Sequence, residues 1–346
     1  MSSELFRPGT ALPPLDKGTL TSSHIVRWCA AQENWDKIHY DRSYARNVAG
    51  LPDTVINGAL KQQFLSQLAT QAFGERSWLW RLTCRFRGPD LVGQRLRGEG
   101  RIRTVDYQAN VTALHLDLHL FNVDIGSATT EGSAVVLLLP VSDADNPHEL
   151  PSRYIEPAAS QTTDVTPRGL DENVPASIRR HIGTEIEHID SFNTVEAGRL
   201  RLFADAVMGL PAYHHDTHAA RSSVHGGLVA PPLFPLHAMS WPAGTHELDT
   251  EPTALGREAV CEVGRAFAKR FGLPPQGLLN GGTNVCIYAL ARPGDTVKAS
   301  SRLAGVRCKT GRHGERILVF DTENRYQTTA GQLLVHEHQT ILHRLI

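Results

Sequence analysis

The sequence predicts an α+β protein made of two copies of one arrangement, in which a helix is wrapped by an antiparallel sheet. Two observations carry this prediction. Helix candidates precede a run of strand candidates in each half of the chain, and the order of helix, polar loop, helix and four strands is the same in both. The strands follow one another without intervening helices, which is not the pattern of a doubly wound parallel sheet.

The first half contains the clearest periodicity. Residues 20–32 offer a serine cap followed by an apolar-rich helix. In residues 57–74, apolar side chains recur every four positions and Gly74 stands where a helix ends, so a longer helix is expected. Alternating apolar residues, Pro140 at the end of the run, and turn residues between segments predict four strands, at 78–86, 94–107, 110–123 and 129–140.

The second half repeats this order. Helices are expected at 193–208 and 252–271, and strands at 283–290, 295–308, 316–327 and 332–344. Each sheet leaves an edge strand that needs a partner, so the two sheets are expected to join edge to edge. The predicted organisation is an irregular arm at 1–20, a first domain at 21–140, a linker rich in Pro, Asp, Ser and Thr at 141–178, and a second domain at 179–346.

Composition restricts the function. The chain has 346 residues, of which 41% are hydrophobic and 21% charged, and its formal net charge is −1. These values are typical of a soluble globular protein with no strong field to attract nucleic acid or an anionic membrane. Five scattered cysteines without a C-x-x-C pair favour a reducing compartment, and no apolar run of 18 residues or secretory signal is present, so a cytoplasmic protein is expected.

The stretch "ENWDKIHYDRSYAR", residues 33–46, concentrates side chains that can move protons. Histidine titrates near neutrality, and Asp36 lies three residues before His39, where it could orient the imidazole or act itself. A second interpretation stays open: the charged side chains form a solvated network and His39 is a hydrogen-bonded partner within it.

This stretch and the following "GLPDTVINGAL" resemble the MaoC-like, R-specific enoyl-CoA hydratases, in which an H-x-D motif precedes an H-G pair that opens the central helix of a hot-dog fold. His39 and Asp41 match the first motif, and Gly58 after Asn57 matches the second. In the second half, "FADAVMGLPAYHHD" and "GGLVAPPLF" resemble the degenerate half of FAS1-type dehydratases. The resemblance implies two hot-dog domains in one chain, a double hot-dog.

The resemblance also implies an activity: a lyase that adds water to a 2-enoyl thioester or removes it from a 3-hydroxyacyl thioester. It implies proton transfer by Asp36 and His39, with Asn34 orienting the water or hydroxyl. The backbone N–H of Gly58, at a helix N-terminus, would bind the thioester oxygen as it gains enolate charge. The remaining expected substrate-binding residues are Asn57, Tyr40 and Asp41.

The sequence departs from the family pattern at the proposed acid–base positions. The family's catalytic aspartate, five residues before its histidine, is Asn34 here, and the family's asparagine, three before, is Asp36. In the second half, the comparison places Tyr213 at the histidine position and Met208 at the aspartate position. We therefore expect one active site, built by the first half, and a non-catalytic second half that shapes the acyl pocket.

The expected substrate is an acyl-CoA or acyl-carrier-protein thioester, with no further cofactor, no metal and no nucleic acid or membrane partner; a homodimer of double hot-dogs is expected. His214 and His218 are four residues apart, but no further ligand at zinc-like spacing accompanies them. Four arginines alternate along one predicted strand: Arg95, Arg97, Arg101 and Arg103. They form either a solvated face of the strand or a set of contacts for the phosphates of CoA. A hot-dog thioesterase and a non-catalytic thioester-binding paralogue are the alternative functions.

Overall fold

The computed structural model describes residues 6–108, 111–139, 148–150, 171–242, 270–273, 278–311 and 314–345. Ten strands form one antiparallel sheet in the order β1-β3-β4-β5-β2-β7-β10-β9-β8-β6. The first-half strands are β1 (Leu15–Thr19), β2 (Ser77–Phe86), β3 (Arg95–Gln108), β4 (Val111–Asn122) and β5 (Ser127–Leu138). The second-half strands are β6 (Glu185–Asp190), β7 (Leu278–Ile287), β8 (Val297–Thr310), β9 (Arg316–Thr328) and β10 (Leu333–Leu345).

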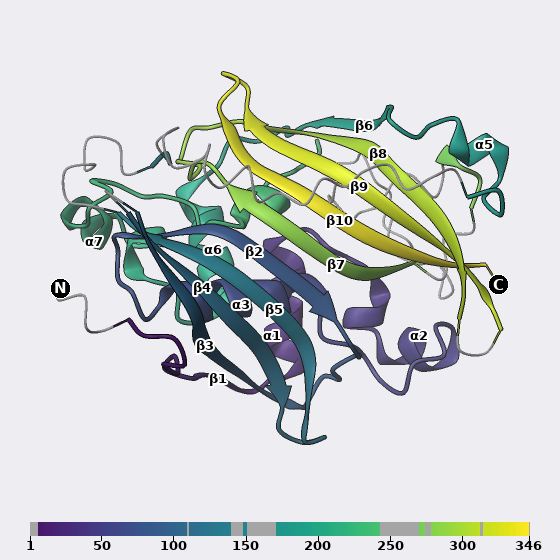
Figure 1. Cartoon of the computed structure of the whole chain (residues 1–346), viewed down its shortest axis with the longest axis horizontal. Helices are drawn as coiled ribbons and strands as arrows, with labels where there is room; N and C mark the ends of the chain where they lie inside the picture. The colour runs from purple at the N-terminus through teal and green to yellow at the C-terminus, as the bar shows by residue number, and fades with distance from the viewer. Residues whose placement is uncertain are drawn as a thin grey trace.

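Helices lie behind this sheet in the view of Figure 1. The longest described helix, α3 (Gly58–Thr70), packs against β2, β3, β4 and β5. Helices α1 (Ser22–Ala31) and α6 (Ala197–Val207) contact each other, one from each half. The shorter helices are α2 (Arg42–Asn47), α5 (Ala176–Arg179) and α7 (Thr217–Ser222), with 3₁₀ turns η2 (Lys37–His39), η4 (Ala212–His214) and η5 (Phe234–His237).

The two halves meet as predicted, because an edge strand of one half pairs with an edge strand of the other. β2 and β7 pair antiparallel, from Arg81 opposite Cys286 to Arg85 opposite Gly282 (Figure 1). The predicted α+β fold of two hot-dog halves is confirmed, and all eight predicted strands are present with ends shifted by a few residues. The expected helix at 252–271 falls almost wholly outside the described residues.

Two strands were not predicted. β1 lies in the expected irregular arm, and β6 precedes the helix of the second half. Both are short edge strands, and the sequence of β1, LDKGT, has neither a long alternation nor a β-branched run. Of the predicted linker, residues 148–150 and 171–178 are described; they include one helical turn, the start of α5, and a bridge from Glu149 to Ala289.

Helix α3 is buried although much of its surface is polar. Lys61, Gln62, Gln63, Ser66 and Gln67 are all buried. Two of these side chains connect the halves: the Gln62 amide donates to Thr283 Oγ1 at 2.8 Å, and the Gln67 amide to the Gly209 carbonyl at 2.6 Å. A buried amide is tolerated because it is hydrogen-bonded, so these contacts fix the two halves against α3.

The junction of the halves depends on a glycine. Gly282 has φ +147°, and a Cβ there would lie 2.5 Å from the Cys84 carbonyl oxygen of β2. We expect Gly282→Ala to lower the free energy of unfolding by about 2 kcal/mol or more, because backbone must move to admit the methyl group. Gly198→Ala is the control, because Gly198 lies in α6 and a Cβ added there would meet no atom within 4 Å; it should gain about 0.4–1 kcal/mol. Denaturant unfolding measures both, and equal stabilities would contradict the prediction.

Candidate active site

The loop after α1 is held by its own polar side chains. Asn34 Oδ1 accepts a hydrogen bond from the Asp36 N–H at 3.2 Å, and Asp36 Oδ1 accepts from the Ile38 N–H at 3.3 Å, at the start of η2. Both side chains are buried, with exposed fractions of 1% and 4%. The sequence order of carboxamide and carboxylate therefore builds two successive turns that present His39.

His39 is hydrogen-bonded at both ring nitrogens. Nδ1 lies 2.9 Å from the Val55 carbonyl oxygen, and Nε2 lies 3.1 Å from the Asn57 side-chain nitrogen. Asn57 Oδ1 accepts from the Ala59 N–H at 2.8 Å as the N-cap of α3, so its NH₂ group is the one that faces His39. The ring thus accepts at Nε2 and donates from Nδ1 to Val55, which is the neutral imidazole in a single tautomer.

Gly58 opens α3 beside this pair. Its N–H makes no hydrogen bond to any residue that the structure describes, as expected for the first turn of a helix. A Cβ at this position would lie 3.1 Å from the Phe86 ring, so the glycine admits an aromatic side chain at close range. The N–H is still available for the predicted contact with a thioester oxygen.

The two other predicted binding residues also hold the loop. The Tyr40 hydroxyl donates to the Trp35 carbonyl at 2.8 Å, and Asp41 Oδ1 accepts from the Tyr44 N–H at 2.9 Å as the N-cap of α2. The structure therefore brings His39, Asn57 and Gly58 together. The contacts of Asn34, Asp36, Tyr40 and Asp41 described above are within the loop, and their roles toward substrate stay predictions.

The second half repeats the histidine site. His214 Nδ1 lies 2.9 Å from the Val229 carbonyl oxygen, and Asp216 caps α7 as Asp41 caps α2. The alignment predicted from sequence was therefore wrong by one residue: His214, not Tyr213, is the equivalent of His39. Counting back five residues from His214 gives Gly209, rather than Met208, at the position of Asn34.

The residues directly before Asn34 and Gly209 both have an unusual backbone conformation. Glu33 has φ +53° and Met208 has φ +63°, and they are the two non-glycine residues with positive φ among those described. Each follows the first helix of its half, α1 or α6. Left-handed backbone costs free energy for residues with a side chain, so the same strained turn at the same place in both halves marks a constraint on the loop that follows.

The halves differ where the central helix begins. Val55 and Val229 are equivalent through their bonds to histidine, so Asn57 and Gly58 correspond to Pro231 and Pro232. Proline has no backbone N–H, so these two positions of the second half offer no donor for an enolate oxygen. This difference supports the predicted assignment of the chemistry to the first half.

Comparison with known proteins agrees with this architecture. Residues 180–337 match the family model of the FAS1-like dehydratase domain region, and residues 10–88 match hydroxyacyl-thioester dehydratase type 2. Each half thus matches a dehydratase family model, and the ten-stranded sheet is that of a double hot-dog. The family resemblance predicted from the loop motifs is confirmed.

Solved structures of MaoC proteins and other double hot-dogs share this fold over almost the whole chain. A MaoC domain protein from Chloroflexus aurantiacus J-10-fl superposes with a TM-score of 0.67 at 12% identity, over 99% of this chain and 97% of the other. A conserved hypothetical protein from Mycobacterium tuberculosis with a double hotdog fold gives 0.58 at 14% identity, over 99% and 98%. At such identities the likeness shows the fold alone, and no curated protein matches the sequence.

A cavity of about 370 Å³ lies beside His214, between the C-terminal part of α3 and the loop at 209–214. Burial lowers the pKa of His214 to about 3, and burial, with the charge of Glu75, raises the pKa of Tyr213 to about 12. Both side chains are therefore neutral at physiological pH. None of the predicted site residues lines this cavity, which is at the other end of α3 from Gly58.

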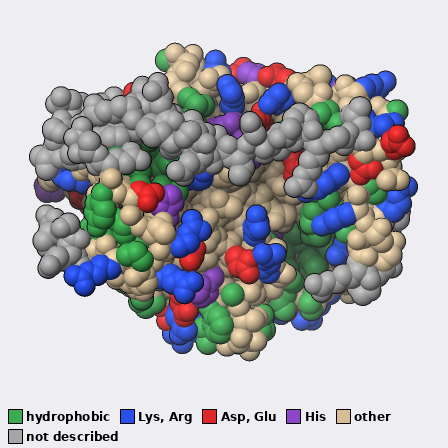
Figure 2. Space-filling view, in the orientation of Figure 1, with side chains coloured by type: hydrophobic (Ala, Val, Ile, Leu, Met, Phe, Trp, Pro, Cys, Tyr) green, Lys and Arg blue, Asp and Glu red, His purple; other side chains and the backbone are tan. Residues whose placement is uncertain are grey.

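The four arginines of β3 are each paired with a carboxylate. Arg95 pairs with Asp16, Arg97 with Glu99, and both Arg101 and Arg103 with Asp117. Figure 2 shows basic and acidic side chains interspersed on this face. The solvated-face interpretation is therefore favoured over CoA contacts. Among the described helices, none has the length and apolar character needed to cross a membrane.

Proposed function

We propose that the chain is a hydro-lyase acting on acyl thioesters, as an enoyl-thioester hydratase or 3-hydroxyacyl-thioester dehydratase. The observation that supports it is the position of His39: a neutral imidazole of fixed tautomer is held against Asn57, the cap of α3. Beside it lies the N–H of Gly58, which no described residue accepts. These are the two groups that the reaction requires, a proton carrier and a preorganised donor for an oxyanion.

In the proposed elimination, His39 Nε2 takes the proton from C2 of the substrate. The electron pair moves toward the thioester carbonyl, whose oxygen is bound by the Gly58 N–H and stabilised by the positive end of α3. The C3–O bond then breaks, and the hydroxide leaves as water with the proton carried by His39, with Asp36 sharing this task. Hydration is the reverse sequence, with Asn34 orienting the water.

Asn57 has a defined part in this scheme. Without substrate, its NH₂ group donates to His39 Nε2. The substrate hydroxyl or water must bind at this same nitrogen. Entry of the substrate replaces this contact, and the displaced amide then donates to the substrate oxygen instead. The acyl chain is proposed to run along α3, and the carrier to be CoA or an acyl-carrier protein. A cytoplasmic location and a homodimer are part of the same proposal.

A non-catalytic, thioester-binding protein is the second candidate, because Nε2 of His39 is occupied and Asn34 and Asp36 cap local turns. Crotonyl-CoA incubated with the purified chain separates the candidates. Loss of the enoyl absorbance without free thiol supports the hydratase. Release of thiol identifies a thioesterase. Saturable binding of crotonyl-CoA with neither change identifies the non-catalytic protein and contradicts the proposal.

The role of Asn57 can be tested in the same assay. Aspartate also caps helices, so Asn57→Asp keeps the acceptor for the Ala59 N–H, but it has no N–H to donate toward Nε2 or the substrate oxygen. We expect kcat/KM to fall by about 10-fold or more, the effect of one lost hydrogen bond to a charged or reacting group, while the unfolding midpoint stays close to that of the wild type. Unchanged activity in this variant would remove Asn57 from the mechanism.

A further inference from the structure

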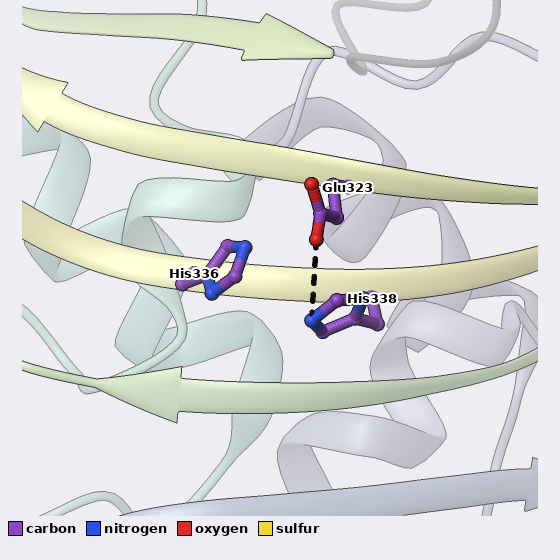
Figure 3. Close-up of side chains that lie close together, drawn as sticks. All are labelled: Glu323, His336 and His338. Atoms are coloured by element: carbon purple, nitrogen blue, oxygen red, sulfur yellow. Dashed lines mark ion pairs between the residues drawn. The ribbon is translucent and has the colours of Figure 1, made fainter. Parts of the chain in front are cut away.

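The outer face of the second half carries a cluster that the proposed reaction does not use. Glu323 lies on β9, and His336 and His338 lie two residues apart on the neighbouring β10, with His338 directly opposite Glu323 in the ladder. Residues two apart on a strand point to the same face. Figure 3 shows the three side chains together on one side of the sheet, in front of the helices.

The spacing suits a shared ion. One ligand atom from each residue can be chosen so that all three lie within 4.8 Å of one another. His338 Nε2 is 3.9 Å from Glu323 Oε1, too far for a hydrogen bond, and the two imidazole centroids are 4.8 Å apart. His336 Nε2 is buried and has no hydrogen-bond partner among the described residues. A buried polar atom without a partner is uncommon and needs an explanation, such as an ion.

Burial of the histidines and the charge of Arg302 beside Glu323 favour the ligating form of each side chain. Burial lowers the pKa of His336 to about 4, helped by His338, and burial also lowers the pKa of His338, so both rings are neutral at pH 7. Burial opposes ionisation of Glu323, but the hydrogen bond and charge of Arg302 outweigh it and hold the pKa of that carboxyl below its usual value. Metals bind neutral imidazole and ionised carboxylate.

Arg302 also orients the carboxylate. Its guanidinium binds Glu323 Oε2, with the Nε contact at 2.8 Å, which leaves Oε1 toward the histidines. Ligating carboxylates in metal sites are commonly held by such an outer hydrogen bond. Two further guanidiniums, Arg81 and Arg325, act on the histidines and would repel a cation. An affinity in the micromolar range is therefore expected, weaker than that of a four-ligand site.

We propose that Glu323, His336 and His338 bind a divalent transition-metal ion, with zinc as the reference ion. Two imidazoles and one carboxylate are a ligand set that zinc accepts, and water would complete the coordination. The site would tie β9 to β10 on the face away from α3. It is independent of the proposed hydro-lyase activity.

The test is titration of the metal-free, full-length protein with zinc sulfate in competition with a chromophoric zinc indicator. The wild type should bind one zinc with micromolar affinity, and His336→Gln and His338→Gln should each weaken binding about 10-fold or more. Glu323→Gln, which keeps the shape of the side chain, should do the same. His188→Gln is the control, because His188 lies in the same half on β6 and is half-exposed.

Circular dichroism of each variant verifies that the sheet is intact. Cobalt(II) provides an independent readout, because imidazole and carboxylate ligation gives a visible absorption that the three variants should lose and His188→Gln should keep. Absence of zinc binding by the wild type overturns the proposal. Binding that persists unchanged in His336→Gln and His338→Gln also overturns it, since the zinc would then be held by other histidines.

Discussion

His39→Ala is expected to lower kcat/KM for hydration of crotonyl-CoA by about 10²-fold or more, as removal of a general acid–base group does. The hydrogen bond to the Val55 carbonyl fixes the tautomer of the His39 imidazole, and its Nε2 faces Asn57 at the start of α3. Alanine removes the proton carrier and leaves the Asn57 amide without its acceptor. The decrease in enoyl absorbance under initial-rate conditions measures the effect.

His214→Gln is the matched control, because His214 occupies the equivalent position in the second half with the same backbone contact. A glutamine amide can still donate to the Val229 carbonyl, so the activity should change little. Asp36→Asn should be nearly as damaging as His39→Ala if the carboxylate has moved to this position. Full activity of Asp36→Asn would show that this exchange of roles is wrong, and equal losses in His39→Ala and His214→Gln would contradict the assignment of the site to the first half.

Asp90→Ala is expected to reduce the free energy of unfolding by about 3–5 kcal/mol, the cost of breaking a buried ion pair from one side. Asp90 is fully buried. Its Oδ2 accepts from Lys61 Nζ at 2.8 Å and from Thr129 Oγ1 at 2.8 Å, and its Oδ1 accepts from the Asn122 amide at 2.7 Å. The substitution leaves the Lys61 ammonium on α3 buried without its counter-ion. It also removes the acceptor of Thr129 Oγ1 and one of the two acceptors of the Asn122 amide. Equilibrium denaturation in urea measures the change.

Two variants make this prediction specific. Glu131→Gln breaks the Arg87–Glu131 pair, in which both side chains are about half exposed, and should cost at most about 1 kcal/mol. The double variant Lys61→Met with Asp90→Leu removes both charges and should be less destabilised than Asp90→Ala. If Asp90→Ala unfolds at the same urea concentration as Glu131→Gln, the buried pair does not anchor α3.

The predicted fold rested on local patterns, and these were sufficient for the long elements. The alternation in residues 111–120 identified β4, and the four-residue spacing of Leu60, Phe64 and Leu68 identified α3. Patterns of this kind record which face is buried. The edge strands β1 and β6 escaped because a short strand paired on one side leaves too few buried positions to form a pattern.

The site was only partly predictable for a similar reason. His39, Asn57 and Gly58 were identified from their motifs, but the contact between His39 and Asn57 spans 18 residues and depends on how the loop returns to α3. The error of one residue at Tyr213 was avoidable. Both halves read H-x-D, at His39–Asp41 and His214–Asp216, and this shared motif gives the correct alignment directly.

The proposed zinc ligands could be predicted from the sequence only in part, for a different reason. His336 and His338 have the spacing of one strand face, which is visible in the sequence as H-E-H. Glu323 joins them only because β9 and β10 pair in one particular register. A shift of that register by one residue would turn Glu323 to the opposite face. Strand register depends on the whole sheet, so the third ligand could not be found from the sequence.

The chain contains two unequal copies of one unit, which are joined in a single sheet by the pairing of β2 with β7. In an assembly of two identical subunits, every substitution appears twice, and a change that spoils one reaction centre spoils both. Covalent fusion removes this restriction. The second copy can carry prolines at positions 231 and 232, where the first carries Asn57 and Gly58, without harm to its neighbour. The two halves should therefore tolerate substitutions unequally. In a random library selected for activity, substitutions should be found far more often at residues 229–232 than at residues 55–58.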